Sequence, residues 1–164
     1  MNRTTEGGPE LGGGRGAGGV LVLVDPSVAG NSPVAELLAR ELRLSVHLRT
    51  DDFLRVIRSG RLPPHLPEAG RQNATALAAA AQAAFAYATR GYQVVVECPA
   101  VPAALDTFRR ESRATGTALH YVVLHAGPAP DDAPHTLDTS DLTDETTAET
   151  VLTALTRRTH LLGW

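Results

Sequence analysis

Short, mostly apolar runs alternate with helical segments along most of this sequence of 164 residues. The first run, residues 20–24, reads Val-Leu-Val-Leu-Val and is apolar on both faces, which is typical of a strand buried inside a parallel sheet. Strands that alternate with helices predict an α/β protein, a three-layer α/β/α sandwich with a mostly parallel sheet and a single domain over residues 20–164. We expect strands at residues 20–24, 45–48, 92–97, 118–124 and 135–138, and helices directly after residue 32 and at residues 53–60, 72–89, 103–115 and 143–158.

The two ends of the sequence differ from this alternating pattern. Residues 1–19 contain eight glycines and no hydrophobic period, so we expect a disordered, glycine-rich arm. The arm lacks the apolar stretch of a signal peptide, so the expected compartment is the cytoplasm, and no run is long enough to predict a membrane partner. The apolar tail, residues 160–164, is expected either to cap the core or to contact a second subunit, which leaves a homo-oligomer open.

Composition excludes several kinds of function. The net charge of −3 provides no basic excess to displace phosphate counterions, so we expect no nucleic-acid partner. A single cysteine, Cys98, excludes an internal disulfide and a zinc site made of several thiolates, and we expect no metal. All 15 basic residues are arginine, which excludes a lysine Schiff base and the lysine ammonium of a phosphate-binding loop.

The loop after the first strand is the first candidate for a binding site, because ligands of open parallel sheets bind beyond the carboxyl ends of the strands. Residues 25–32 have the length and the small residues of a P-loop, G-x-x-x-x-G-K-[ST]. Ser32 followed by Pro33 is typical of a helix N-cap with proline at the first helical position.

With this loop as its starting point, the sequence resembles the P-loop kinases, in particular the chloramphenicol phosphotransferase-like and zeta-toxin-like small-molecule kinases. The resemblance extends from about residue 19 to residue 158 and implies a P-loop NTPase-like fold. The segments that carry it, besides the loop, are HLRTDDF at residues 47–53, Gln72-Asn73 at the start of an alanine-rich helix, GYQVVV at residues 91–96, LHYVVL at residues 119–124 and LDTS at residues 137–140.

The sequence departs from that family at the groups that bind nucleotide. Asp25 replaces the first glycine of the loop, Asn31 replaces the lysine, and Pro33 offers no backbone N–H to an anion. The lid arginines of the family are missing, because no arginine occurs between Leu124 and Arg157. Two unit charges about 4 Å apart repel by about 4 kcal/mol near a protein surface, so Asp25 would oppose a phosphate. We therefore expect that the nucleotide site is lost and that the protein uses no cofactor.

Three carboxylates are the candidate catalytic groups: Asp25, Asp52 and Glu97. The resemblance implies that Asp51 or Asp52 lies near the acceptor hydroxyl of the substrate. We expect one of the two to cap a helix that begins at Phe53 and the other to face the pocket, and we favour Asp52 for the pocket. The resemblance also implies a magnesium-associated acid at Glu97. In a site without phosphates, a desolvated Glu97 could instead serve as a general acid, with a hydrogen-bonded structural role as the alternative.

The candidate substrate-binding residues are Asp51, Arg49, Arg71, Asn31, Ser32 and His125. Arg49 and Arg71 are expected to orient a carboxylate or phosphate of the ligand, and surface ion pairs are the alternative. His125 follows the fourth strand and is favoured among the histidines, with a structural role as the alternative.

These features lead to three hypotheses, of which we favour a repurposed kinase fold that acts on a small organic molecule without ATP. Carboxylate acid–base chemistry would then support cyclisation, isomerisation, elimination or hydrolysis, in keeping with bacterial secondary metabolism. A non-catalytic binding module is the second hypothesis. A true phosphotransferase, in which Arg49 or Arg71 replaces the loop lysine, is the third.

Overall fold

Five parallel strands form the central sheet of the computed structural model, which describes residues 7–27, 32–129, 131 and 133–162. The strands lie in the order β2-β3-β1-β4-β5, and every neighbouring pair is parallel. Their bounds are Gly19–Val24 (β1), Ser45–Arg49 (β2), Gln93–Glu97 (β3), Ala118–His125 (β4) and Thr136–Asp138 (β5). The parallel sheet predicted from the apolar runs is confirmed.

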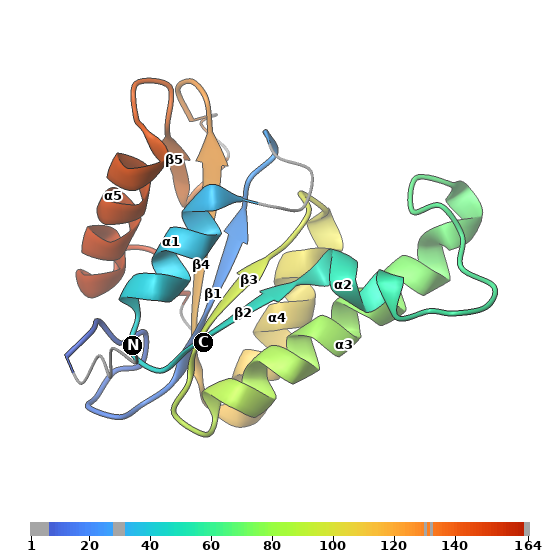
Figure 1. The fold of residues 1–164 in the computed structure, drawn as a ribbon, viewed down its shortest axis with the longest axis horizontal. Helices are drawn as coiled ribbons and strands as arrows, with labels where there is room; N and C mark the ends of the chain where they lie inside the picture. Colours follow the sequence, from blue (N-terminus) through green and yellow to red (C-terminus); the bar gives the residue numbers. More distant parts are fainter. Residues whose placement is uncertain (1–6, 28–31, 130, 132, 163–164) are drawn as a thin grey trace, which may run out of the picture.

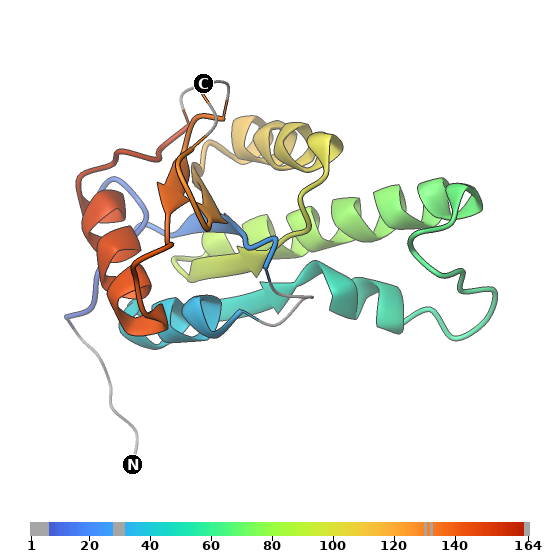
Figure 2. The same ribbon diagram turned by 90° about the horizontal axis from the view of Figure 1, so that it is seen from above.

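Helices cover both faces of this sheet, which confirms the three-layer sandwich. Figures 1 and 2 show α1 and α5 on one face and α3 and α4 on the other, while α2 and the segment that leads to α3 extend beyond the sheet. The helices are Pro33–Glu41 (α1), Thr50–Arg55 (α2), Gly70–Ala88 (α3), Pro102–Thr115 (α4) and Asp144–Thr156 (α5), and a single 3₁₀ turn, Pro67–Ala69, precedes α3.

The alternation of side chains along β1 divides the core into two halves. Val20 and Val22 pack with residues of α3 and α4, whereas Leu21 and Leu23 pack with residues of α1 and α5. All four side chains are at most 1% exposed, as expected for a central strand with helices on both sides. The small side chains of α3, mostly alanine, allow that helix to lie close to the sheet.

The carboxyl ends of β1 and β3, which lie side by side in the sheet, are the part of the fold that positions a site. The two strands are neighbours, and the Cys98 N–H donates to the Leu23 carbonyl oxygen just beyond their paired residues (3.0 Å). The chain leaves β1 towards α1 on one face and leaves β3 towards α4 on the other. The two connections therefore diverge and leave a crevice at this edge, which is where doubly wound sheets bind ligands.

The glycine-rich segment before β1 packs against the domain, which corrects the disordered arm expected over residues 1–19. Leu11 is 1% exposed within the core on the α1 and α5 face. Its N–H donates to the Gln93 side-chain oxygen (2.6 Å), and its carbonyl oxygen lies 2.9 Å from His120 Nε2. Gly19 belongs to β1, and residues 1–6 of the arm lie outside the described residues.

One apolar side chain and a few hydrogen bonds hold this segment, so a search for hydrophobic periodicity does not detect it. Glycine permits the close approach: a Cβ on Gly19 would lie 2.6 Å from the Leu11 Cβ. The Arg43 N–H also donates to the Pro9 carbonyl oxygen (3.1 Å), which ties the start of the segment to the end of α1.

The segment after α5 returns to the sheet through residues 158–162. Leu161 forms an antiparallel bridge with His120, and the Leu162 N–H donates to the Leu119 carbonyl oxygen (2.9 Å). Leu162 is 6% exposed in the core, so this part of the apolar tail caps the domain, the first of its two expected roles. In the described part of the chain, no helix has both the length and the apolar character that a bilayer crossing requires.

The packing of Leu11 predicts a measurable loss of stability. Truncation by Leu11→Ala should lower the free energy of unfolding by about 3 kcal/mol, because it leaves a cavity in a closed core. Chemical denaturation followed by circular dichroism measures the change. Leu44→Ala is the matched control at a leucine that is 49% exposed, and it should cost less than about 1 kcal/mol. Equal effects of the two substitutions would contradict the packed N-terminal segment.

Candidate functional site

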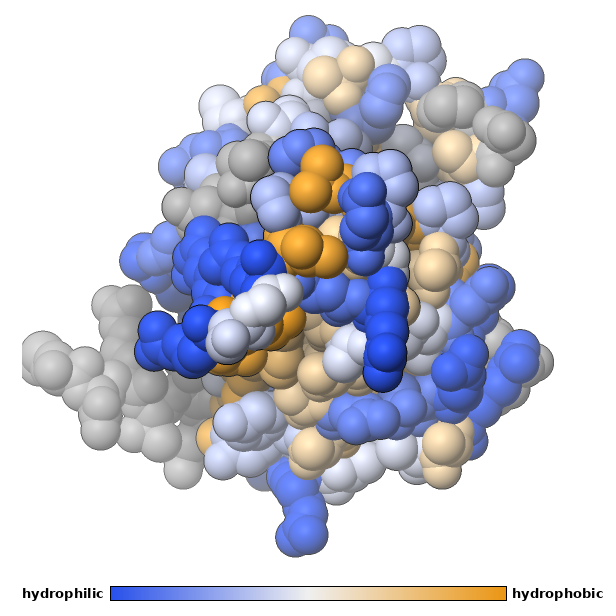
Figure 3. All heavy atoms as spheres, turned by 90° about the vertical axis from the view of Figure 1, so that its right-hand side faces the viewer, coloured by the Kyte–Doolittle hydropathy of each residue, from blue (hydrophilic) through white to orange (hydrophobic). Residues whose placement is uncertain are grey.

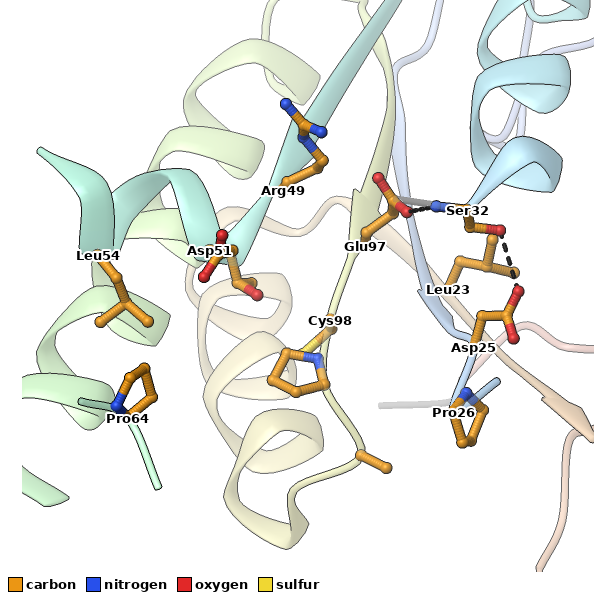
Figure 4. A pocket seen from close by; sticks show the side chains of 13 residues that line it. Leu23, Asp25, Pro26, Ser32, Arg49, Asp51, Leu54, Pro64, Glu97 and Cys98 are labelled. Carbon is orange, nitrogen blue, oxygen red and sulfur yellow. Dashed lines mark hydrogen bonds between the residues drawn. The ribbon is translucent and has the colours of Figure 1, made fainter. Parts of the chain in front are cut away.

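A cavity of about 610 Å³ opens at the carboxyl ends of β1, β2 and β3. Figure 4 shows Leu54 of α2 and Pro64 on one side, Asp25 and Pro26 on the opposite side, and the end of β3 between them. The lining residues are Leu23, Asp25, Pro26, Ser32, Arg49, Thr50, Asp51, Leu54, Pro64, Glu97, Cys98, Pro99 and Ala100. An apolar wall with a few converging polar groups is typical of a site for a small molecule.

Ser32 connects the start of α1 with the ends of β1 and β3. It occupies the predicted N-cap position with Pro33 next to it, yet its side chain makes no capping hydrogen bond. Its hydroxyl donates instead to the Asp25 carboxylate (3.1 Å), and its backbone N–H donates to the Glu97 carboxylate. Figure 4 shows both contacts. Two internal carboxylates therefore occupy the two hydrogen-bond donors of Ser32.

The Glu97 carboxylate is 8% exposed and has a partner on each oxygen. One oxygen accepts from the Ser32 N–H, and the other lies 2.8 Å from His47 Nε2 on β2. These contacts match the hydrogen-bonded structural role, the alternative for Glu97, since they join the end of β3 to both neighbouring segments. A role in proton transfer stays a prediction.

The Asp25 carboxylate lies directly after β1 and is also hydrogen-bonded within the chain. One oxygen accepts from the Ser27 N–H (3.2 Å) and the Ser27 hydroxyl (2.6 Å), and the other accepts from the Ser32 hydroxyl (3.1 Å). Asp25 is half-buried and lines the cavity, and its catalytic role stays a prediction.

The structure corrects the expected roles of Asp51 and Asp52. Helix α2 begins at Thr50, with Arg49 at the N-cap position, so both aspartates lie in the first turn and neither caps a helix that begins at Phe53. Asp51 lines the cavity and pairs with Arg55 (2.8 Å). Asp52, the one favoured from the sequence, lies outside the described lining.

Asp52 instead accepts from Arg49 Nε (3.3 Å) and Arg55 Nη1 (3.5 Å). Asp51 and Asp52 are consecutive residues of α2, so their side chains leave the helix in different directions, and Asp51 is the one that lines the cavity. The sequence could not fix the start of α2 because Thr50, Asp51 and Asp52 are all preferred N-cap residues, whereas the observed N-cap residue is Arg49.

The remaining candidate residues divide between the cavity and the surface. Arg49 lines the cavity. Arg71 is exposed in the first turn of α3 and is not among the described lining residues. His125 ends β4, with Nδ1 3.3 Å from the Gly127 carbonyl oxygen, and it also lies outside that lining. Asn31 lies outside the described residues.

Sequence reasoning missed the apolar wall formed by Leu54 and Pro64. Leu54 lies three residues after Asp51, so both side chains point to one side of α2. Pro64 belongs to the proline-rich segment before α3, which composition identifies only as irregular. The spacing of Leu54 relative to Asp51 is the signal that could have found part of this wall.

The described residues contain no cluster of three His, Cys, Asp or Glu side chains that could hold a metal ion. Cys98 is the one thiol that lines the cavity, and burial raises the pKa of this thiol from its ordinary value of 9.0 to about 12. A thiol in this state is a weak nucleophile at neutral pH.

The high pKa of Cys98 predicts a slow reaction with thiol reagents. At pH 8 the folded chain should react with Ellman's reagent about a thousandfold more slowly than the urea-unfolded chain, because the thiolate is that much rarer. The sequence contains no other cysteine, so the unfolded chain is its own control. Equal rates in the two states would show an accessible, ionised thiol.

The fold is shared with several solved proteins, kinases among them. The APS kinase CysC of Mycobacterium tuberculosis matches with a TM-score of 0.66 and 19% identity over 85% of this chain and 97% of its own. A gluconokinase from Sinorhizobium meliloti matches with a TM-score of 0.56 and 19% identity, over 86% of this chain and 93% of its own. The tunicamycin resistance protein of Deinococcus radiodurans matches with a TM-score of 0.55 and 15% identity, over 89% of this chain and 99% of its own.

Sequence comparison adds no closer relationship. No protein-family model and no curated protein sequence matches this chain. At identities of 15% to 19%, the structural similarity concerns the architecture. The chain shares the α/β fold of these solved proteins.

Proposed function

We propose that this protein binds a small organic molecule in the cavity and acts on it without ATP, through carboxylate acid–base chemistry. The observation that carries the proposal is that both hydrogen-bond donors of Ser32 are occupied by carboxylates of the chain. Its N–H donates to Glu97 and its hydroxyl donates to Asp25. In a working P-loop, the backbone N–H groups at the start of this helix bind phosphate.

A triphosphate would have to displace the buried Glu97 carboxylate to reach the Ser32 N–H. It would then lie next to two carboxylates, each of which repels a phosphate charge about 4 Å away by about 4 kcal/mol near a surface. The sequence offers no lysine in compensation, and Pro33 removes a further N–H donor. These features together support the loss of nucleotide binding.

Two of the groups proposed for chemistry, Asp51 and Arg49, lie on the α2 side of the cavity. Asp51 is a proton-transfer candidate in place of Asp52, because its carboxylate lines the cavity and is 40% exposed. Arg49 lines the same cavity and provides a cation that can orient an anionic group of the substrate. Asp25 is proposed as the second acid–base group, and Glu97 as a third whose contacts also hold the site together.

The small-molecule nature of the ligand is supported by the cavity and by the fold. A cavity of about 610 Å³ is of the size that holds small organic molecules. The similar solved proteins include an APS kinase, a gluconokinase and a tunicamycin resistance protein. The reaction class proposed is a cyclisation, isomerisation, elimination or hydrolysis, each of which carboxylates can catalyse by proton transfer, with water as the second reactant in a hydrolysis.

A non-catalytic binding module is the second candidate function. The observation in its favour is that every oxygen of Asp25 and Glu97 already accepts from, or pairs with, a group of the chain. Carboxylates engaged in this way can shape a binding site without transferring protons.

Nucleotide binding separates the proposal from kinase chemistry. Isothermal titration calorimetry with magnesium-ATP at millimolar concentration should give no binding heat, because the donors of Ser32 are occupied. The double variant Asp25→Gly/Asn31→Lys restores the glycine and the lysine of the P-loop pattern and is the matched control. Micromolar binding by the natural sequence would overturn the ATP-independent function and support a phosphotransferase.

Proton transfer by Asp51 is tested on a compound that native mass spectrometry shows bound to the protein after incubation with a cell extract. Turnover of this compound should fall at least about a hundredfold in Asp51→Asn, which keeps the size of the side chain and loses its proton chemistry. Asp52→Asn is the matched comparison in the same helical turn, and its turnover should fall far less. Full turnover in Asp51→Asn would contradict its role, and binding without turnover by the natural sequence would favour the binding module.

A further inference from the structure

A second cavity, of about 510 Å³, adjoins the first one on the side of α3. It lies among α2, the segment before α3, α3 itself and the start of α4. Thr50, Leu54, Pro64 and Pro99 line both cavities, so the two form one recess with a polar end at Asp25 and Glu97 and an apolar end at α3.

The apolar end contains almost no charge. Its walls are made by small and aliphatic side chains, which are Leu54, Ala74, Ala76, Leu77, Val101 and Ala103. His65 is the one titratable side chain among its described lining residues. Figure 3 views this end of the molecule and shows apolar residues at the surface, framed by strongly hydrophilic ones. An apolar chamber of this kind favours an apolar group over water.

The Asn73 side chain provides one polar feature in this apolar chamber. Its Nδ2 donates to the Pro64 carbonyl oxygen (2.8 Å), which fixes the orientation of the amide because only the NH₂ end can donate to a carbonyl. Its Oδ1 atom is buried and has no hydrogen-bond partner among the described residues. A buried acceptor without a donor is unfavourable, so this atom is a natural partner for an N–H or O–H group of a ligand.

The wall that carries Pro64 is held in place by its own hydrogen bonds. The Leu62 N–H donates to Gln72 Oε1 (2.8 Å), and Gln72 Nε2 donates back to the Leu62 carbonyl oxygen (2.9 Å). Together with the contact between Asn73 and Pro64, these bonds join the irregular segment to the first turn of α3. The chamber is therefore formed before a ligand arrives, which lowers the entropy that binding would otherwise lose.

We propose that the ligand is an amphipathic molecule whose apolar, ring-sized body occupies the α3 end of the recess, where an N–H or O–H group donates to Asn73 Oδ1. Its anionic head lies at Arg49, which lines the first cavity, and not at Ser32, where Asp25 and Glu97 would repel it. This inference rests on the proposed function, because it describes the substrate class of the same site. The recess would then hold a molecule with both parts more tightly than one with either part alone.

Anilinonaphthalene sulfonate is a suitable probe because it combines an aromatic body, one N–H donor and one anionic group. Fluorescence titration of the full chain should show one saturable site per chain. The N-methyl derivative of the same dye lacks the donor and should bind about tenfold more weakly, since Asn73 Oδ1 then stays without a partner. Equal affinities of the two dyes would overturn the role of Asn73.

Two variants of α3 test the location of the probe. Ala74→Phe fills the chamber from an exposed position and should weaken binding at least about tenfold. Ala86→Phe makes the same change at an exposed position of the same helix outside the described lining of both cavities, and it should leave the affinity unchanged. If both variants bind the dye as the natural sequence does, the chamber is not the binding site and the inference fails.

A third variant, Asn73→Leu, should remove the preference for the dye with the N–H donor, because the acceptor is absent. Circular dichroism before titration establishes that each variant is folded, and a retained preference in folded Asn73→Leu would contradict the inference. These outcomes are independent of ATP binding. If the protein binds nucleotide and the dye results are as expected, only the ATP-independent function is overturned. If the dye results show that the chamber is not the binding site, the ATP-independent function is unaffected.

Discussion

The contact between the Glu97 carboxylate and the Ser32 N–H fixes the carboxyl end of β3 against the start of α1, and the site depends on this arrangement. It joins the end of β3 to the start of α1, and the second Glu97 oxygen extends the connection to His47 on β2. A helix start offers backbone donors to an anion, and here the anion belongs to the chain itself. One side chain therefore connects three elements and occupies a backbone donor at the start of α1.

The sequence predicts the architecture because the signals for it are repeated along the chain. Each apolar run is followed by a helical segment, and burial on both faces follows from the composition of residues 20–24 and 93–97. The packing of the segment before β1 was not predictable in the same way. It depends on one leucine and on two buried polar side chains, Gln93 and His120, which lie far from it in the sequence.

The site was predictable in part. The sequence places Asp25, Ser32, Arg49, Asp51 and Glu97 at the ends of neighbouring strands, and the structure brings them to one cavity. The choice of Asp52 over Asp51 depended on the first residue of a short helix, where a shift of a few residues turns each side chain to another face. The apolar chamber could not be predicted, because an irregular proline-rich segment forms one of its walls.

Gln93 has a consequence for how far this chain can be shortened. Its amide accepts from the Leu11 N–H and donates to the Ala17 carbonyl oxygen (3.1 Å), so one side chain closes the loop between these two residues. A truncated form that starts at β1 would leave the Gln93 side-chain oxygen and His120 Nε2 without the contacts they make with Leu11, beside an uncovered apolar core. Fusion partners and affinity tags are therefore best joined ahead of Pro9, whose carbonyl oxygen accepts from the Arg43 N–H.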